Sequence, residues 1–301
     1  MLSLPNITVI GAVNIDICGR PINKFIPCDS NVGFVTHSIG GVGFNVARNL
    51  SLLGCNVSFV AALGNDTYTN EIETEAEKFN IDLSACLRLE EKNSTYLFIT
   101  DEIGDMLAAV NDMKINERLD KSFFKPLFPL ISKSDAVIID ANLESGLIEY
   151  LCKNITAPIF ADAVSASKVM RLKNSLEYFH SFKPNAIEAS MLTGIEITDF
   201  DSAKKAAKML VENFGIDRVY ITLGSNGLTA YNGTEIVQRP TVSKTVVNTA
   251  GAGDAFFACT VVAELIGKGF EECAELALKG AASVCKTEKS INPDIFNDVF
   301  K

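Results

Sequence analysis

The alternation of short apolar runs with longer amphipathic stretches constrains the fold of this chain more than any other feature. Five apolar runs have the length and composition of buried strands, at residues 7–11, 57–62, 136–140, 158–161 and 218–223. Four stretches with helical periodicity lie between them, at residues 45–53, 69–79, 144–153 and 202–214. Because strands that alternate with helices pair in parallel, the sequence predicts an α/β fold with a mainly parallel central sheet flanked by helices on both faces.

Two segments interrupt this alternation. Residues 15–38 have no helical period and contain Pro21, Pro27 and Gly33, and residues 95–110 have the pattern of a hairpin with its turn at residues 101–105. We expect both segments to form a small antiparallel flap, a lid inserted into a single domain that spans residues 1–301. The chain contains no internal repeat or low-complexity linker that would mark a second domain.

Composition disfavours several classes of protein. The chain is 48% hydrophobic, and its net charge of −10 disfavours binding to a nucleic-acid polymer or an acidic membrane. No apolar run approaches the ~18 residues of a membrane span, and the N-terminus lacks the pattern of a secretory signal. The eight cysteines include no C-x-x-C pair, so we expect reduced thiols in a cytoplasmic protein. The chain has only two histidines, which disfavours a His-based zinc site or a Ser-His-Asp triad.

Candidate catalytic chemistry lies in residues 248–257, Asn-Thr-Ala-Gly-Ala-Gly-Asp-Ala-Phe-Phe. Gly251, Ala252 and Gly253 leave backbone N–H groups uncovered at the start of the helix predicted for residues 255–266, which favours a phosphate or a developing phosphoryl anion there. Asp254 lies in the same turn and could accept a proton from a hydroxyl group that attacks the phosphorus. Taken alone, Gly-Ala-Gly-Asp is more often a loop with an aspartate near a helix N-cap.

Two polar clusters lie in the first fifty residues. Asn14 and Asp16 follow the first predicted strand on one side of the chain, where a carboxylate would bind the vicinal hydroxyls of a ribose; a loop aspartate that caps a turn is the alternative. Gly40 and Gly41 permit close approach of the backbone to a ligand, and Asn45 projects from the next helix. The glycine run follows an irregular segment, and no acidic residue ends a second strand ~20 residues later, so a loop for a small polar substrate is favoured over a dinucleotide site.

Two further clusters lie in the C-terminal half. Asn185 and Glu188 are three residues apart near a predicted helix start, where an amide and a carboxylate would organise hydrated Mg²⁺ and phosphate oxygens. The same pair is the pattern of a helix capping box. Thr222, Gly224 and Gly227 lie in a turn whose hydroxyl and amides would hold a nucleotide, although a plain hairpin turn has the same pattern.

The order of these five clusters resembles that of the ribokinase-like (PfkB) family of carbohydrate and nucleoside kinases. The resemblance covers almost the whole chain and includes both family signatures, at residues 40–64 and 248–258. In this family ATP donates its γ-phosphoryl group to a sugar hydroxymethyl group. The resemblance therefore implies that Asp254 is the catalytic base, that residues 251–253 form the anion hole, and that Glu188 lies near Mg²⁺, through water.

The family resemblance also implies which residues hold the two substrates. The sugar would be held by Asn14, Asp16, Gly40, Gly41, Asn45 and Asp254. ATP would be bound by Asn185, Thr222, Gly224, Gly227, Gly251 and Gly253. Asn248 departs from the family, which usually has an aspartate there near a monovalent-cation site; backbone carbonyls could still bind K⁺, so its role is left open.

Several stretches, Asn248 included, resemble the pseudouridine kinase subgroup of this family. They lie at residues 11–16, 29–33, 40–45, 111–113, 162–166, 247–251 and 292–294. The reaction implied is ATP plus pseudouridine giving pseudouridine 5′-phosphate and ADP, with Ser30 and Asn111 in or beside the flap reading the uracil edge. Glu144 falls where the family has a substrate residue, but its surroundings differ and we do not include it.

Two alternatives remain for the function. Ribokinase, or another nucleoside or sugar kinase of the same family, would have the same signatures. A noncatalytic sugar- or nucleotide-binding protein on this fold is the alternative of another class, although the intact Gly-Ala-Gly-Asp run disfavours it. We also expect a homodimer formed through the flap, because a sheet edge left uncovered favours pairing with a second copy.

Overall fold

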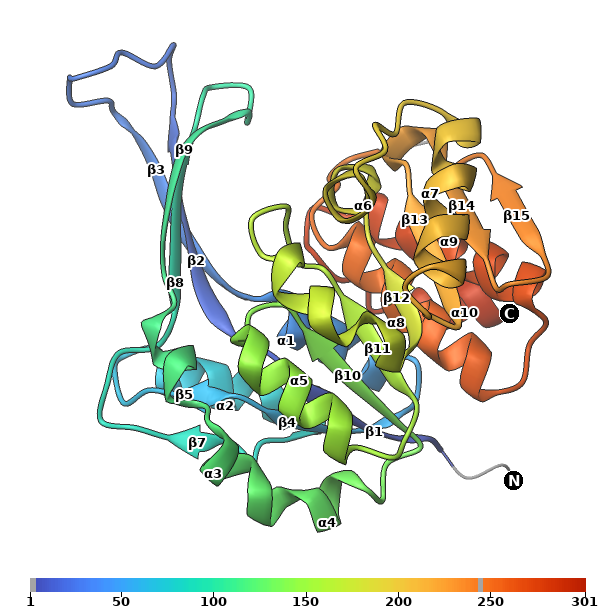
Figure 1. The fold of residues 1–301 in the computed structure, drawn as a ribbon. Coiled ribbons are helices and arrows are strands. Elements are labelled where there is room, and N and C mark those ends of the chain that lie inside the picture. The colour runs from blue at the N-terminus through green and yellow to red at the C-terminus, as the bar shows by residue number, and fades with distance from the viewer. Residues whose placement is uncertain (1–3, 243–245) are drawn as a thin grey trace.

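The computed structural model describes residues 4–242 and 246–301, and a nine-stranded sheet forms its central layer (Figure 1). In spatial order the strands are β15 (Ile236–Arg239), β14 (Leu228–Tyr231), β13 (Arg218–Thr222), β12 (Phe179–Lys183), β11 (Ile159–Asp162), β10 (Ala136–Asp140), β1 (Asn6–Ile10), β4 (Asn56–Val60) and β6 (Ile81–Asp82). Neighbouring strands from β6 to β13 pair in parallel, and β14 and β15 add an antiparallel edge. The predicted α/β fold with a mainly parallel sheet is confirmed.

Helices cover both faces of this sheet. One face packs against α1 (Val42–Leu52), α2 (Thr69–Lys78), α8 (Ala252–Leu265), α9 (Phe270–Cys285) and α10 (Ile295–Phe300). The other packs against η1 (Lys114–Arg118), α3 (Lys121–Phe124), α4 (Phe128–Ile131), α5 (Ser145–Asn154), η3 (Val169–Tyr178), α6 (Ala186–Thr193) and α7 (Phe200–Glu212). Within β10, Ile138 faces the first set and Ile139 the second. Burial on both faces explains why these strands are continuous apolar runs.

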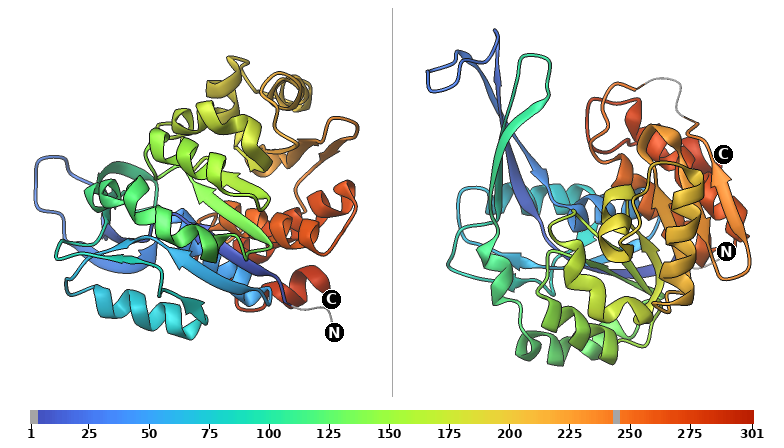
Figure 2. Two further views of the ribbon diagram at one scale, coloured as in Figure 1. Left: turned by 60° about the horizontal axis from the view of Figure 1, so that its bottom comes forward. Right: turned by 45° about the horizontal axis from the view of Figure 1, so that its top comes forward.

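A separate four-stranded sheet, the flap, projects from this body (Figures 1 and 2). Its strands lie in the order β3 (Gly33–Gly40), β2 (Asn14–Pro21), β8 (Thr95–Thr100) and β9 (Met106–Asp112). The two hairpins are antiparallel, but β2 pairs with β8 in parallel, so the prediction of an antiparallel flap was wrong at this central pairing. Both strands leave the body in the same direction, and at the base of the flap Ile15 N–H donates to the Ser94 carbonyl (2.8 Å).

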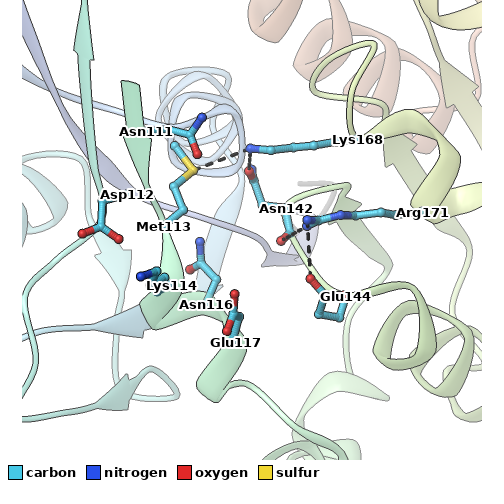
Figure 3. A pocket seen from close by; sticks show the side chains of 10 residues that line it. All are labelled: Asn111, Asp112, Met113, Lys114, Asn116, Glu117, Asn142, Glu144, Lys168 and Arg171. Atoms are coloured by element: carbon cyan, nitrogen blue, oxygen red, sulfur yellow. Dashed lines mark hydrogen bonds and ion pairs between the residues drawn. The ribbon is translucent and has the colours of Figure 1, made fainter. Parts of the chain in front are cut away.

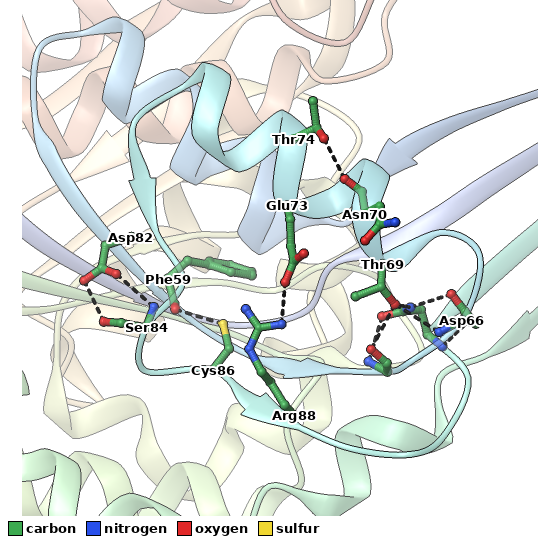
Figure 4. A network of polar contacts seen from close by, with 12 residues as sticks. Phe59, Asp66, Thr69, Asn70, Glu73, Thr74, Asp82, Ser84, Cys86 and Arg88 are labelled. Atoms are coloured by element: carbon green, nitrogen blue, oxygen red, sulfur yellow. Dashed lines mark hydrogen bonds and ion pairs between the residues drawn. The ribbon is translucent and has the colours of Figure 1, made fainter.

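Polar contacts anchor the base of β8 to the body. The backbone N–H and the side-chain amide of Asn93 donate to the Asp66 carboxylate at 2.8 and 2.7 Å. Thr69, which lies near Asp66 in Figure 4, donates to the Gly64 carbonyl (2.9 Å). Two short elements nearby, β5 (Ala62–Leu63) and β7 (Leu87–Arg88), pair with each other. These contacts fix the point from which the flap projects.

The structure bears on two expectations drawn from composition, which are reduced thiols and the lack of a membrane span. All eight cysteines are free thiols, five of them buried, and Cys28 in the flap is exposed. Burial raises the pKa of Cys55 to about 12. Among the described residues, none of the helices combines the length and hydropathy that crossing a bilayer requires.

Candidate active site

Three charged residues end three adjacent parallel strands at one edge of the central sheet. Asp140, Asp162 and Lys183 are the last residues of β10, β11 and β12, and strand register places each beside the next. Ligands of open α/β sheets bind at this carboxyl edge. Lys183 forms a buried ion pair with Asp162 (2.9 Å). The sequence analysis missed all three; a charge at the end of an apolar strand is the signal that would have found them.

Asp254 is buried in the first turn of α8, close to this edge. The side-chain amide of Asn45 donates to its Oδ2 at 2.7 Å, across 209 residues of sequence. Arg48 donates to the other atom of that amide, Asn45 Oδ1, and pairs with Glu75 (3.0 Å), so the amide nitrogen is turned toward Asp254. The structure thus brings Asn45 and Asp254 together and adds Arg48, which sequence reasoning did not single out.

Burial raises the pKa of Asp254 to about 7, and the charge of Asp162 adds to the shift. The positive charges of Lys183 and Arg48 and the Asn45 hydrogen bond act in the opposite direction. A carboxylate with a pKa near the working pH combines availability as a base with a real affinity for the proton. This arrangement suits general-base chemistry on a hydroxyl group.

Of the three backbone N–H groups predicted to bind an anion at the start of α8, two are available and one is not. Gly251 is the N-cap residue at φ 80°, where a Cβ would overlap the Ser290 carbonyl, and among the described residues no side chain caps the helix. Ala252 N–H donates to the Thr249 carbonyl (3.2 Å), so it is occupied. Within the described residues, the N–H groups of Gly251, Gly253 and Asp254 donate no hydrogen bond. The helix start therefore remains a site for an anion.

The predicted sugar-binding residues lie together at the base of the flap. Asn14 donates to Asp16 Oδ1 (2.6 Å), and burial raises the pKa of Asp16. A side chain at Gly40 would overlap the Asp16 carboxylate, and Gly41 is the N-cap residue of α1. These residues form a surface with a carboxylate and an amide, as a diol requires.

Asp140 holds two loops of this surface in place. Its Oδ2 accepts hydrogen bonds from the backbone N–H groups of Ala12 (3.0 Å) and Gly43 (3.2 Å) and from the side chain of Asn142 (3.0 Å). The loop after β1 and the start of α1 are thereby fixed to the end of β10. Burial raises the pKa of Asp140, whereas the hydrogen bonds from Ala12 and Asn142 lower it.

Asn185 and Glu188 form the capping box that was the alternative explanation of their spacing. Asn185 Oδ1 accepts from Glu188 N–H (2.9 Å), and Glu188 Oε2 accepts from Asn185 N–H (2.7 Å). Burial, and next the charge of Asp162, raise the pKa of Glu188. The carboxylates of Glu188 and Asp162 repel each other, and a cation bound near them would relieve this repulsion. Mg²⁺ is commonly held by one or two carboxylates with waters and phosphate oxygens. Within the described chain, no cluster of three or more His, Cys, Asp or Glu is arranged to hold a metal.

Thr222 lies beside Asn185, and its N–H donates to the Pro184 carbonyl (3.0 Å). Gly224 is the first residue of the short helix η4 (Gly224–Asn226), and Gly227 follows its end, in the hairpin between β13 and β14. A pocket of about 420 Å³ adjoins this turn and is lined by its residues Leu223, Ser225 and Asn226. The sequence analysis did not predict the other lining residues, which are Ala186, Ile197, Thr198, Asp199, Phe200 and Pro240. The turn predicted to bind nucleotide thus borders a cavity.

Asn111 and Ser30 lie at opposite ends of the flap. Strand register places Asp16, Tyr96 and Asn111 in one row across three strands, so their side chains share a face. Asn111 and Glu144 line a pocket of about 250 Å³ (Figure 3). Ser30 is exposed in the loop at the far tip of the flap, well beyond Pro21 and Gly33, so the structure does not bring it to the other site residues.

The side chain of Asn248 closes the loop that precedes α8. Its amide nitrogen donates to the Glu288 carbonyl and its Oδ1 accepts from Ala250 N–H, both at 2.9 Å. Asn248 thus supports the start of α8 through neutral hydrogen bonds that an aspartate could not fully reproduce, because a carboxylate has no donor.

The chain belongs to the pfkB family of carbohydrate kinases, whose family model matches residues 4–295. Kinases of this family are phosphotransferases that act on a hydroxyl acceptor and use ATP with Mg²⁺. The protein is therefore a sugar or nucleoside kinase.

Three relatives illustrate the range of this family. The chain is 29% identical to a pseudouridine kinase of Escherichia coli (strain K12), over 96% of this chain and 93% of that protein. It is 27% identical to a guanosine-inosine kinase of Exiguobacterium acetylicum, over 97% and 98% of the two chains. The crystal structure of a putative sugar kinase from Clostridium perfringens has a TM-score of 0.85 and 29% identity, over 99% and 95%.

Proposed function

We propose that this chain is a cytoplasmic kinase that transfers the γ-phosphoryl group of ATP to the 5′-hydroxyl of pseudouridine, giving pseudouridine 5′-phosphate and ADP. The observation that carries the choice of a nucleoside is the pocket of about 250 Å³ beside the row of Asp16, Tyr96 and Asn111. It leaves room for a base next to a sugar held at Asp16. The similarity to the E. coli pseudouridine kinase supports the choice of base.

In this proposal Asp254 accepts the proton of the 5′-hydroxyl as it attacks the phosphorus. Asn45 orients the Asp254 carboxylate through the contact of 2.7 Å. The N–H groups of Gly251 and Gly253, which donate no hydrogen bond within residues 4–242 and 246–301, stabilise the negative charge of the transferring group, with Ala252 completing the turn. Asn14, Asp16, Gly40 and Gly41 hold the ribose. The protein contributes positioning and electrostatic stabilisation, with little covalent work.

ATP would lie along the turns at the ends of β12 and β13, against Asn185, Thr222, Gly224 and Gly227. Glu188 would hold Mg²⁺ through water, since its Oε2 already accepts a backbone hydrogen bond. K⁺ would be bound by backbone carbonyls of the loop at Asn248, whose own side chain is engaged.

We further propose that two copies pair through the flap. One face of it carries exposed apolar side chains, Val35 of β3 (79% exposed), Leu97 of β8 (42%) and Val110 of β9 (68%). Exposed apolar area of this kind marks an association surface. Ser30 would reach a base only from a closed flap or from the flap of the second copy. Light scattering should show a dimer that Leu97→Asp converts to a monomer; a monomeric wild type would refute this part.

A substrate panel tests the proposed reaction. Purified protein with Mg-ATP is assayed with pseudouridine, uridine, guanosine, inosine, adenosine, ribose and fructose. We expect pseudouridine to have the highest kcat/KM, by at least about tenfold, which corresponds to about 1.4 kcal/mol of transition-state binding. Efficient phosphorylation of ribose, adenosine or fructose without any of pseudouridine would overturn the substrate. Binding of these compounds without turnover would indicate a noncatalytic protein.

A further inference from the structure

Arg48 of α1 is a buried cation one side chain away from the proposed catalytic base. Only 4% of its surface is exposed, and its Cζ lies 5.3 Å from the centroid of the Phe44 ring. Burial lowers the pKa of Arg48, and the pairing with Glu75 opposes that shift. The negative charges of Asp254 and Asp16 oppose it as well. Arg48 is therefore a positive charge that two carboxylates of the site share.

Three segments of the chain hold the guanidinium group in one orientation. Its Nη1 donates to Glu75 Oε1 of α2 at 3.0 Å. Its Nη2 donates to the Ile39 carbonyl of flap strand β3 at 3.0 Å and to Asn45 Oδ1 of α1. Its Nε is buried and has no hydrogen-bond partner among the residues that the structure describes. A buried donor without a partner costs free energy, so stability alone does not explain the placement of Arg48.

Arg48 determines which way the side-chain amide of Asn45 points. The backbone of Asn45 is fixed, because its N–H donates to the Gly41 carbonyl (2.8 Å) and its carbonyl accepts from the Asn49 side chain (2.9 Å). The amide itself could still turn by about 180° and exchange its oxygen with its nitrogen. A guanidinium group has donors only, so the amide atom that faces Arg48 has to be the oxygen. The nitrogen then faces Asp254, at the contact of 2.7 Å.

This orientation of the amide favours the ionised form of Asp254. A carboxylate accepts the N–H of the amide, whereas a protonated carboxyl group would need an acceptor that the fixed amide nitrogen does not supply. An amide free to turn would offer its oxygen to the protonated form, and the preference for the ionised form would be lost. The orientation of one amide thus affects the proton affinity of the base.

The charged groups around Asp254 act in both directions. Burial raises its pKa to about 7, and the charge of Asp162 on β11 adds to the shift. Lys183 on β12, the hydrogen bond from Asn45 and the charge of Arg48 lower it. Arg48 therefore acts on Asp254 in two ways, through its charge and through the amide that it orients.

We propose that Arg48 is a positioning residue for the phosphoryl transfer, which acts through Asn45 by fixing the amide in the orientation that donates to Asp254. The inference rests on the proposed function only in taking Asp254 as the base, and not on the identity of the acceptor. Because Asn45 occupies Oδ2 of Asp254, Oδ1 is the oxygen left to accept the proton of the hydroxyl group. Arg48 itself contacts neither substrate in this arrangement.

Two variants separate the charge of Arg48 from its effect on the amide. They are assayed with whichever acceptor of the substrate panel gives the highest kcat/KM. Arg48→Met should move the acid limb of kcat/KM to higher pH by roughly half a unit to one unit, below the 1–3 units of a directly contacting charge. At about pH 9, where Asp254 is ionised, it should still lower kcat about tenfold or more. KM for ATP should stay within about twofold.

Arg48→Lys keeps the positive charge but lacks the planar group that reaches three acceptors at once. Its acid limb should therefore stay within about 0.3 unit of the wild type, while kcat at about pH 9 falls several-fold. A residue with a purely structural role would not give this separation, because loss of folded enzyme scales the whole pH profile by one factor.

A matched control and a second variant guard against loss of the fold. The control is Arg88→Met, which removes an ion pair between β7 and Glu73 of α2 at the surface and should change neither kcat nor the acid limb. Arg48→Met leaves the carboxylate of Glu75, 22% exposed, without its buried partner. If that variant does not fold, Arg48→Met combined with Glu75→Met removes the unpaired charge as well, and the same kinetic results are expected.

A double-mutant cycle with Asn45→Ala decides whether Arg48 acts through Asn45. In the Asn45→Ala background, Arg48→Met should lower kcat at about pH 9 by no more than about twofold, because the amide that it orients is gone. Equal losses in both backgrounds, or an unchanged kcat and acid limb in Arg48→Met, would overturn the inference and leave Asp254 as the base. Turnover like that of the wild type in Asp254→Asn would instead overturn the proposed mechanism.

Discussion

Helices α6 and α8 begin at the same edge of the central sheet, and each carries an acidic residue three positions after its N-cap. In α6, Glu188 reaches back to the N-cap backbone, and Asn185 caps the helix with its own side chain. In α8, the N-cap is Gly251, no side chain in the described part of the chain caps the helix, and Asp254 instead accepts a hydrogen bond from Asn45 of α1. The same position in two helices thus has opposite uses.

The difference shows what an anion site needs at a helix start. Where side chains satisfy the first N–H groups, as in α6, the helix is stabilised and its start offers less to a ligand. Where a glycine leaves them open, as in α8, the helix forgoes that stabilisation and retains donors for a phosphoryl group. Four predictions test this contrast between the two helix starts.

The largest expected effect is that of Asp254→Asn. Loss of the general base should lower kcat by roughly 10²- to 10⁴-fold, because the amide cannot accept the proton of the attacking hydroxyl. Binding of ATP, measured by calorimetry, should remain close to the wild-type value, since the open N–H groups are backbone atoms. Turnover like that of the wild type would remove Asp254 from the proposed mechanism.

The second-largest expected effect is the dependence of kcat/KM on pH. The pKa of Asp254, about 7, lies above its ordinary value of 3.8, so kcat/KM should fall about tenfold per pH unit below pH 7 as the base is protonated. The same sign means that ionisation of Asp254 lowers the free energy of unfolding as the pH rises from about 4 to about 7. Lys183→Met removes a charge that lowers this pKa, so the acid limb should move to higher pH. If the acid limb of the pH profile does not move in Lys183→Met, a group other than Asp254 is responsible for that limb.

Gly251→Ala tests the open start of α8 against a matched glycine at the end of α6. Both Gly251 and Gly194 have positive φ, 80° and 71°, so alanine strains either position by about 1–2 kcal/mol. A Cβ at Gly194 has open space, whereas one at Gly251 overlaps the Ser290 carbonyl. Gly251→Ala should therefore lose more stability in urea denaturation, and only this variant should also lose activity. If Gly251→Ala and Gly194→Ala lose the same stability, the turn before α8 can shift to make room for a Cβ atom.

The smallest effects concern the capping box of α6. Asn185→Ala should lower the free energy of unfolding by about 1 kcal/mol through the lost cap. Glu188→Gln keeps an oxygen acceptor for Asn185 N–H, so stability should change by less than about 0.5 kcal/mol. If Glu188 also holds hydrated Mg²⁺, this variant should need several-fold more Mg²⁺ for half-maximal activity. An unchanged Mg²⁺ requirement would leave Glu188 with its capping role alone.

Local patterns predicted much of this molecule because they depend on neighbours in sequence. The strand predicted at residues 136–140 coincides with β10, and the hairpin predicted at residues 95–110 is formed by β8 and β9. The Asn185–Glu188 spacing predicted a cap that the structure forms, and its catalytic use stays a prediction. By contrast, the parallel pairing of β2 with β8 has no local signature, because it depends on where two distant strands leave the body.

The sequence by itself determined the α/β alternation, the interrupting flap and the glycine turn before Asp254, since hydrophobic periodicity and glycine conformation act within a few residues. Only the tertiary structure decided which charges face one another. Strand register placed Asp140, Asp162 and Lys183 side by side, and the packing of α1 against α8 brought Asn45 to Asp254. The burial that raises the pKa of Asp254 comes from that packing, because desolvation depends on every segment that surrounds a group.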